Sequence, residues 1–415
     1  MTNNLFITGF LRSGTTLVDK LINFSPRALI VSQPLFYAYL NIKKRFLESL
    51  GLPPPTYPLG NLFLQTGFQS EQFTSYLDST PIDDRWIEEA FIACPQYEQS
   101  RYITWRKSPD SPALFCPGVS HTLRHWALKH REPISTLVGS KEVLCEEFIP
   151  HLINQGTRVI LVIRDPRAVV ASIKFGKGHV YANPRLTTLY ILRQWRKSIA
   201  FALAFRSDSR LLTVRYEDLV QKPDLVLSQV FTWLDLPSPP NAIRDVPLYD
   251  QHGEAWIGNS SFEKYSTISN HSLTRYRELL DPDTLRYIEA ICGPEMKVSG
   301  YRFEASKTPT RVAINNFREI PTNSSSGATP VESGSDPENR KAELTRLQYL
   351  TEDLPIKEIN RWFLFEKAFT RLHAGAPVLN NSPQHLPTAD TLPPRSGTTP
   401  EAWPHATRDS NDQPE

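Results

Sequence analysis

Residues 5–22 read LFITGFLRSGTTLVDKLI and join an apolar run, a loop with two glycines and an amphipathic segment. Residues 5–8 predict a short buried strand, and residues 15–24 predict a helix because apolar residues recur at helical spacing. Gly9 and Gly14 let the backbone between them curl and approach a ligand closely. A strand, a curled loop and a helix N-terminus in this order predict an anion site built from backbone amides.

The loop departs at one position from the phosphate-binding pattern G-x-x-x-x-G-K-[ST]. Thr15 stands where that pattern has lysine, whereas Thr16 fits the last position. Arg12 adds a permanent cation with a forked donor geometry inside the loop. The missing lysine argues against a P-loop kinase. A tight turn with a surface arginine is the plain alternative, but the strand–loop–helix order favours anion binding.

Two further strands lead into polar residues. Residues 159–163 (VILVI) predict a buried parallel strand that ends at Arg164, and the helix after it carries Ser172. Residues 211–214 (LLTV) predict a third strand, followed by Tyr216. This alternation predicts an α/β, P-loop-like three-layer fold with a central parallel sheet. Ligands on such sheets bind beyond the carboxyl ends of the strands, where these residues fall.

Arg164 and Ser172 can converge on a second anion, because arginine binds phosphate with two donors and a hydroxyl can add a third. Taken alone, Arg164 fits an ion pair with Glu217 or Asp218 equally well, and Ser172 fits an ordinary helix position. Together with the loop, the pair predicts a ligand with phosphate groups at both ends of a nucleoside.

With these motifs in order, the chain resembles the sulfotransferases that use 3′-phosphoadenylyl sulfate (PAPS), and its loop is most similar to the tyrosylprotein and carbohydrate branch. The resemblance spans residues 1–303, and its further matches are RYEDLVQKP at 215–223, NSSFEKYSTISNHSLTRYRELLDP at 259–282 and SGY at 299–301. It implies transfer of a sulfuryl group from PAPS to a hydroxyl of a small molecule, glycan or tyrosyl residue. The product is adenosine 3′,5′-bisphosphate, and no metal is implied.

The resemblance also implies roles for single residues. Lys141 resembles a lysine that faces the sulfuryl group, and Tyr216 resembles a tyrosine that lies against adenine. The plain alternatives are a solvated lysine at a strand end and a tyrosine in the core. Ser260 and Ser261 resemble a loop serine near the bridging oxygen, and turn capping is their plain alternative. The implied PAPS-binding residues are Arg12, Ser13, Gly14, Thr15, Thr16, Arg164, Ser172, Tyr216, Ser260 and Ser261.

Gln33 stands where similar members carry a glutamate as general base. A glutamine amide cannot take up a proton at neutral pH. Glu142, next to Lys141, is the first substitute and completes an expected catalytic set with Arg12 and Lys141. His121 and His125 are further candidates, although all three also fit ordinary structural positions. Two alternatives remain open. The acceptor hydroxyl is acidic enough to lose its proton without a strong general base, or the protein binds the nucleotide without catalysing transfer.

Composition limits the partners and the cellular compartment of the protein. The chain has 415 residues, of which 40% are hydrophobic and 22% charged, and its net charge of +2 provides no global field for nucleic acid. The four cysteines are scattered without metal-binding spacing, which favours a reducing compartment. No apolar run has the length of a membrane span. We therefore expect a cytoplasmic enzyme without metal, membrane or nucleic-acid partner.

Changes in composition predict four segments. A sulfotransferase domain is expected over residues 1–303, followed by a flexible polar linker over 304–340. Helical periodicity returns over residues 341–375 and predicts a helical extension. Residues 376–415 are rich in Pro, Ser and Thr and predict a disordered tail.

Overall fold

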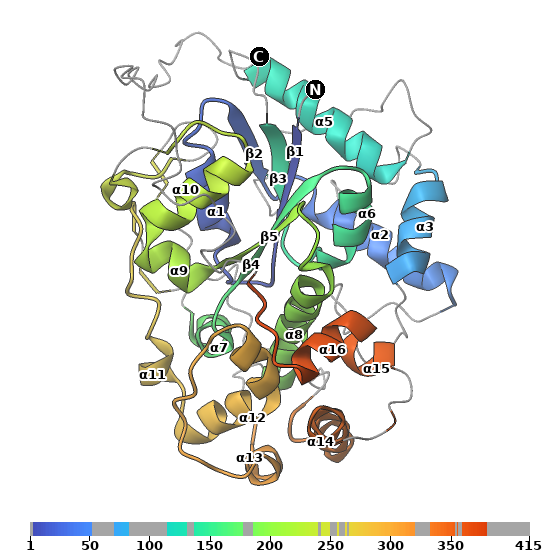
Figure 1. Cartoon of the computed structure of the whole chain (residues 1–415), viewed down its shortest axis with the longest axis vertical. Helices are drawn as coiled ribbons and strands as arrows, with labels where there is room; N and C mark the ends of the chain where they lie inside the picture. Colours follow the sequence, from blue (N-terminus) through green and yellow to red (C-terminus); the bar gives the residue numbers. More distant parts are fainter. Residues whose placement is uncertain are drawn as a thin grey trace, which may run out of the picture.

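The structure is a computed structural model of the whole chain (Figure 1). It describes the backbone of residues 3–51, 70–82, 114–130, 137–176, 186–239, 242–249, 255–256, 262–263, 265–319, 333–352, 355 and 359–379; the side chains of residues 3 and 126–130 are left out.

The described part of the chain forms one five-stranded parallel sheet with the order β2-β3-β1-β4-β5 (Figure 1). The strands are β1 (Asn3–Thr8), β2 (Ala28–Ser32), β3 (Leu137–Lys141), β4 (Arg158–Ile163) and β5 (Leu211–Arg215). This confirms the predicted α/β fold. β1 lies at the centre, where the strand order switches direction, so the loop after β1 occupies the usual ligand position of such sheets.

Helices cover both faces of the sheet. On one face lie α1 (Thr15–Ile22), α9 (Tyr216–Gln221) and α10 (Pro223–Trp233). They pack on buried strand residues that point to this face, such as Ile7. The other face carries α2 (Phe36–Ser49), α3 (Ser70–Ser79), α5 (Phe115–His130), the 3-10 turn η2 (Glu146–Phe148), α6 (Ile149–Asn154), α7 (Pro166–Phe175) and α8 (Thr188–Phe205).

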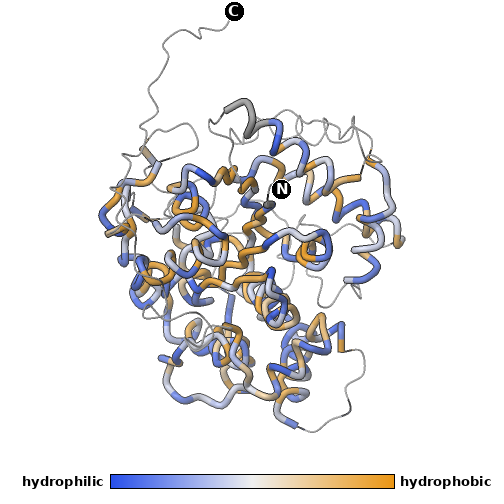
Figure 2. Tube along the Cα trace, turned by 45° about the horizontal axis from the view of Figure 1, so that its top comes forward, coloured by the Kyte–Doolittle hydropathy of each residue, from blue (hydrophilic) through white to orange (hydrophobic). Residues whose placement is uncertain are grey.

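The remaining elements follow the last strand. They are the 3-10 turn η3 (Ile243–Asp245) and the helices α11 (Tyr276–Leu279), α12 (Pro282–Val298), α13 (Thr310–Asn316), α14 (Pro337–Thr351), α15 (Ile359–Phe363) and α16 (Glu366–His373). Hydrophobic residues gather on the strands and on the inner sides of the helices (Figure 2). Among the described helices, none combines the length and the apolar character of a membrane span.

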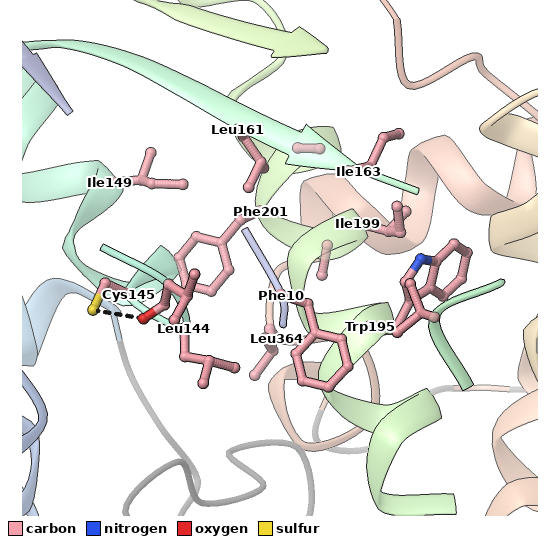
Figure 3. Packing of buried hydrophobic residues seen from close by; sticks show 14 of the residues in the cluster. Phe10, Leu144, Cys145, Ile149, Leu161, Ile163, Trp195, Ile199, Phe201 and Leu364 are labelled. Carbon is pink, nitrogen blue, oxygen red and sulfur yellow. Dashed lines mark hydrogen bonds between the residues drawn. The ribbon is translucent and has the colours of Figure 1, made fainter. Parts of the chain in front are cut away.

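The helical extension shares its hydrophobic core with the sheet. Leu364, from the turn between α15 and α16, belongs to the same buried cluster as Phe10 of the β1–α1 loop and Trp195 and Phe201 of α8 (Figure 3). Glu343 of α14 is buried and accepts hydrogen bonds from Arg193 Nε at 2.7 Å and from Arg196 Nη1 at 2.6 Å. The described part of the extension is therefore built into the main body.

The predicted flexible linker differs from the structure over residues 304–319. Helix α13 packs on α12, and the Phe317 ring stacks on Tyr287 with centroids 3.7 Å apart. Glu319 accepts hydrogen bonds from Lys174 Nζ and Thr188 N at 3.1 and 2.9 Å. The polar composition of this stretch reflects side chains that bond to the main body.

Residues 320–332 of the predicted linker and residues 380–415 of the predicted tail lie outside the described residues. Val378, inside the predicted tail, is buried, and its backbone N–H donates to Val298 O at 2.8 Å.

Two glycines allow the β1–α1 loop to lie against its neighbours. Gly14 caps α1 with φ of 95°, and a Cβ atom there would lie 2.2 Å from Cδ2 of Tyr216. A Cβ atom on Gly9 would lie 2.4 Å from Val162 O of β4. Any larger residue would force the loop away from the ends of β4 and β5.

We expect Glu343→Ala to destabilise the fold by about 3–5 kcal/mol, since it leaves two buried guanidinium groups without their shared carboxylate. Denaturant unfolding measures this loss. Glu338→Ala is the matched control, because Glu338 is exposed on the first turn of the same helix. A chain ending at residue 306 should be insoluble or unfolded. Equal stability of the two variants, together with a folded truncation, would contradict the shared core.

We expect Gly14→Ala to cost more stability than Gly156→Ala. Gly156 also has positive φ, at 79°, but an added Cβ there meets no heavy atom within 4 Å. It therefore reports backbone strain alone, about 1–2 kcal/mol, while Gly14→Ala adds the clash with Tyr216. In the Tyr216→Ala background the ring is absent, so Gly14→Ala should cost only the backbone strain. The difference between its costs in the two backgrounds is the coupling energy of a double-mutant cycle. Equal losses of stability at both glycines would show that the loop can shift away from Tyr216 without cost.

Candidate functional site

The β1–α1 loop presents the start of a helix at the carboxyl edge of the sheet. Gly14 has no side chain with which to cap α1, so an anion is a suitable acceptor for the first amides of the helix. Ser13 is buried, and its Oγ has no hydrogen-bond partner in the described part of the chain. A buried hydroxyl without a partner costs free energy unless a ligand or water binds it. Thr15 and Thr16, as expected, form the first turn of α1.

Arg12 and Ser172 meet although they are far apart in the sequence. Arg12 Nε donates to Ser172 Oγ, on the second turn of α7, at 3.1 Å. Arg12 also adopts φ of 65°, a left-handed backbone conformation that is uncommon outside glycine and is often found at binding sites. The loop cation and the predicted second anion motif therefore belong to one site.

Arg164 ends β4 and holds the loop from the side. Its Nη1 donates to Arg12 O at 2.9 Å, and its Nη2 donates to Ser272 O at 2.8 Å. Its Nε is buried and has no hydrogen-bond partner among the described residues. The guanidinium group is thus anchored at one end and retains donor capacity for an anion.

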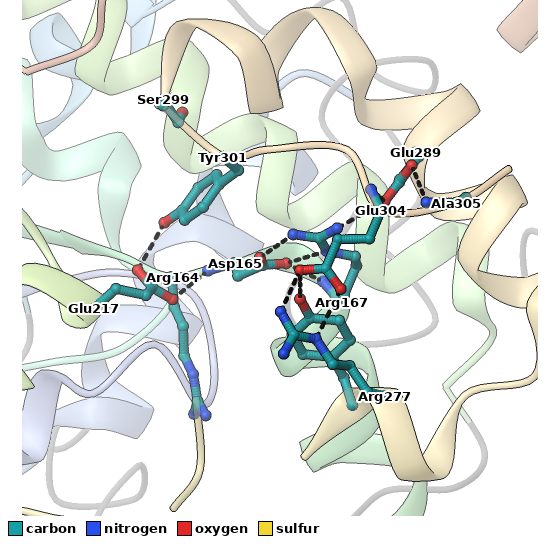
Figure 4. A network of polar contacts seen from close by, with 12 residues as sticks. Arg164, Asp165, Arg167, Glu217, Arg277, Glu289, Ser299, Tyr301, Glu304 and Ala305 are labelled. Carbon is teal, nitrogen blue, oxygen red and sulfur yellow. Dashed lines mark hydrogen bonds and ion pairs between the residues drawn. The ribbon is translucent and has the colours of Figure 1, made fainter. Parts of the chain in front are cut away.

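The alternative in which Arg164 pairs with Glu217 or Asp218 is wrong. Glu217 accepts from Asp165 N at 2.9 Å and from Tyr301 OH at 3.1 Å, while Asp218 pairs with Arg215. Arg164 carries its guanidinium away from this network (Figure 4). Burial, followed by the charge of Asp165, raises the pKa of Glu217.

The residues that follow Arg164 fix the end of β4. Asp165 caps α7 by accepting from Arg167 N, and its carboxylate also binds the Arg167 side chain at 2.6 Å. Arg167 Nη1 reaches Glu289 of α12 at 2.7 Å (Figure 4). Because all three side chains are buried, this ion network sets the direction in which the preceding residue leaves the strand.

Tyr216 closes the site from the end of β5. Its ring lies 4.5 Å from the Arg164 guanidinium carbon, a cation–π distance, and faces Gly14. Its hydroxyl is 2.9 Å from Ser272 Oγ. Ser272 is a site residue that sequence reasoning missed, and its only signal was its place within the matching stretch of residues 259–282.

Lys141 and Gln33 form a second part of the same edge. Lys141 ends β3 and is 1% exposed, so the alternative of a solvated lysine is wrong. Its Nζ donates to Gln33 Oε1 at 2.8 Å, and Gln33 N donates to Lys141 O at 2.7 Å. Burial lowers the pKa of the Lys141 ammonium to about 8. Gln33, with φ of 52°, is therefore held by Lys141 at both its backbone and its side chain.

Glu142 lies on the other side of this strand end. It is fully buried, and its Oε1 accepts from Leu35 N at 3.0 Å. Successive residues of an extended chain point to opposite faces, and the Glu142 carboxyl acts electrostatically on Tyr39 in the opposite core. Burial raises the pKa of Glu142 to about 8, so the carboxyl is mostly protonated at neutral pH.

The two histidines lie at the opposite edge of the sheet from the loop. Their helix α5 contacts Asn4, near the amino end of β1: Asn4 Nδ2 donates to Ser120 Oγ at 3.4 Å, and Arg124 Nη2 donates to Asn4 Oδ1 at 3.3 Å. His121 and His125 are therefore wrong as candidates for the base. Ser260 and Ser261 lie outside the described residues.

No group of three or more His, Cys, Asp or Glu side chains in the described ranges is arranged to hold a metal ion. The residues brought together around the β1–α1 loop are instead cations, hydroxyls and amides, and the cations are Arg12, Arg164 and Lys141. Such a set suits an anionic ligand.

Two sulfotransferases are similar to this chain in sequence. The putative protein-tyrosine sulfotransferase of Caenorhabditis elegans is 25% identical over 227 residues, covering 50% of this chain and 84% of that protein. Carbohydrate sulfotransferase 1 of Mus musculus is 25% identical over 357 residues, covering 73% of this chain and 80% of that protein.

Solved structures are more distant. The sulfotransferase domain from the curacin biosynthetic pathway has a TM-score of 0.38 and 18% identity, covering 73% of this chain and 99% of that chain. Retinol dehydratase in complex with androsterone and the inactive cofactor PAP has a TM-score of 0.36 and 16% identity, covering 72% and 82%. The sulfotransferase domain profile matches residues 2–300. The chain therefore belongs to the sulfotransferase family, whose donor is PAPS and whose acceptors bear a hydroxyl group.

Proposed function

We propose that the carboxyl edge of this sheet binds PAPS with the phosphosulfate on residues 12–16 and the 3′-phosphate between Arg164 and Ser172. The observation that carries this assignment is that the Arg12 side chain reaches Ser172 while Arg164 binds the Arg12 carbonyl. Three elements thereby bring two guanidinium groups to one place, and no carboxylate in the described residues pairs with Arg164. Tyr216 lies beside them, at a position suited to a flat base.

The charges at this edge fit sulfuryl transfer. When an acceptor oxygen attacks sulfur in line, negative charge develops on the bridging oxygen of the leaving bisphosphate. Arg12 and Lys141 are the cations that we assign to this charge, and preorganised donors of this kind stabilise transition states strongly. A P-loop lysine and Mg²⁺ serve a more highly charged phosphoryl transfer. Threonine at position 15, where the P-loop pattern has lysine, is consistent with this difference.

The acceptor, we propose, is an acidic hydroxyl such as the phenol of a tyrosyl residue. Gln33 cannot take up a proton, and Glu142 faces away from Lys141 and is mostly protonated at neutral pH. A phenol has a pKa near 10 and loses its proton far more readily than a sugar alcohol. No described residue places an exposed carboxylate in contact with Lys141 or Gln33, which favours the phenol. A carbohydrate hydroxyl is the second candidate, because the mouse relative is named for it.

A cytoplasmic location also stays a proposal. Its support is that Cys116, Cys145 and Cys292 are buried thiols. Fractionation of cells that express the tagged full-length chain tests it.

We expect Arg164→Ala to weaken binding of adenosine 3′,5′-bisphosphate by about 10- to 150-fold, as expected for the loss of a charge-assisted phosphate contact. ADP and adenosine 5′-phosphosulfate, which lack the 3′-phosphate, should lose clearly less affinity, because for them the variant removes only the support that Arg164 gives to the Arg12 carbonyl. Calorimetry measures the three affinities. Arg158→Ala is the matched control, because Arg158 begins the same strand at the other edge and pairs with Asp235 at the surface.

Two results would oppose this assignment. If Arg164→Ala weakens all three nucleotides equally, Arg164 acts only as an anchor for Arg12 and Ser272. If ATP with Mg²⁺ raises the melting temperature of the wild type as much as the bisphosphate does, the two-phosphate site itself is wrong.

We expect Gln33→Glu to extend activity to less acidic acceptors. The wild type should sulfate a series of phenols with rates that rise with phenol acidity, and should act weakly on sugar alcohols. The new carboxylate beside Lys141 should raise rates on alcohols more than on phenols, because a positioned base typically contributes 10²–10⁴-fold. Gln33→Leu controls for loss of the amide. A wild type that prefers sugar alcohols over phenols would refute the acidic acceptor.

A further inference from the structure

Asp19 is a buried carboxylate that the assignments above leave unexplained. It lies on α1 directly behind the loop and is 0% exposed. Neither carboxylate oxygen has a hydrogen-bond partner in the described part of the chain. Its ion pair is with the buried Lys20, the next residue of the same helix, at 3.5 Å. A buried carboxylate is costly to keep unless another charge compensates it.

The strand register places Lys141 on the same side of the sheet as Asp19. Lys141 pairs with Ile7 of β1 and with Ser32 of β2, and paired residues of neighbouring strands point to the same face. Ile7 belongs to the core beneath α1, so Lys141 and Ser32 face this helix too. Ser32 Oγ is also buried without a hydrogen-bond partner among the described residues. Asp19, Ser32 and Lys141 thus share a buried polar layer under α1.

We propose that Asp19 is a positioning residue that supplies the negative charge which keeps the buried Lys141 ammonium protonated, a charge that Gln33 cannot provide. Gln33 gives Lys141 one acceptor but no charge. A buried ammonium needs a counter-charge as well as hydrogen bonds. The inference rests on the proposed function, because it concerns the cation assigned to the leaving oxygen.

Four charged groups act on Lys141 in addition to its burial. Among them, Asp19 has the largest effect and favours the charged form, as Glu142 does when it is ionised; Lys20 and Arg12 oppose it. Burial is the dominant cause that lowers the pKa of Lys141 to about 8. Removing the Asp19 charge lowers this pKa further. Activity that needs the ammonium is present below the pKa and is lost as pH rises through it, so the loss moves to lower pH.

The reverse reaction with an aryl sulfate tests this and uses the proposed phenolic acceptor in its simplest form. 4-Nitrophenyl sulfate gives its sulfuryl group to the 5′-phosphate of adenosine 3′,5′-bisphosphate: the aryl O–S bond breaks, the phosphate O–S bond forms, and 4-nitrophenolate leaves. The phenolate departs without a proton, so the alkaline loss of rate reports groups of the protein. We expect a wild-type midpoint near pH 8 and a downward shift of about one pH unit or more in Asp19→Asn.

Control variants separate charge from structure. Asp19→Glu should restore the wild-type midpoint, and Asp218→Asn, at the same edge but paired with Arg215, should not move it. Lys141→Arg should abolish the alkaline loss, since arginine stays charged, and Asp19→Asn should then have no effect on the pH profile. A rate that Asp19→Asn lowers equally at all pH values would overturn the proposal and make Asp19 structural.

A second measurement needs no turnover. Competitive acetylation of the full chain across pH, read by mass spectrometry at Lys141, gives the pH at which its amine becomes reactive. This pH should fall in Asp19→Asn and stay in Asp218→Asn, and an unchanged value would refute the counter-charge. If the wild type shows this titration but binds no bisphosphate, the proposed function fails while the Asp19–Lys141 pairing stands.

Discussion

The guanidinium group of Arg164 is the interaction on which the arrangement of this site depends. It donates to the carbonyl oxygens of Arg12 and Ser272 and lies over the ring of Tyr216. One side chain at the end of β4 therefore joins the loop after β1, the segment before α11 and the end of β5. Its position is set in turn by the buried ion network of Asp165, Arg167 and Glu289 (Figure 4). Ion pairs outside the proposed anion site thus determine where its guanidinium group can lie.

Charge balance differs between the two halves of the edge. Around Arg164, carbonyl oxygens and an aromatic face surround a cation, and nearby carboxylates are bound elsewhere. Lys141 is buried beside a neutral amide, and burial lowers its pKa to about 8. Arginine keeps its charge in almost any protein environment, whereas a buried lysine keeps its charge only with a suitable partner. The lysine half of the site is therefore the half whose function depends on pH.

Much of this edge was predictable because its signals are local. The strand that ends at Arg164, the glycines of the loop and the hydroxyl of Ser172 each depend on a few neighbouring residues. The side on which a residue lies, and the partner it meets, depend on residues far away. Glu142 was a reasonable base from its place beside Lys141, but strand alternation turns it into the opposite core. His121 looked suitable by residue type, yet its helix lies at the other edge of the sheet.

The helices of the extension were predicted, but their attachment to the main body was the least predictable feature, for a physical reason. Helix α14 buries Glu343 and Arg346, so its buried side lacks the apolar pattern by which a packed helix is recognised. The partners of Glu343 are Arg193 and Arg196, about 150 residues earlier.

These contacts give the extension a connection to the site. Arg193 and Arg196 flank Trp195 on α8, and Trp195 Nε1 donates to Arg164 O at 2.7 Å. The turn of α8 that binds Glu343 on one side thus fixes the backbone of Arg164 on the other. Residues beyond 300, where the family match ends, therefore support the anion site from behind. They do so by holding the helix against which the end of β4 is positioned.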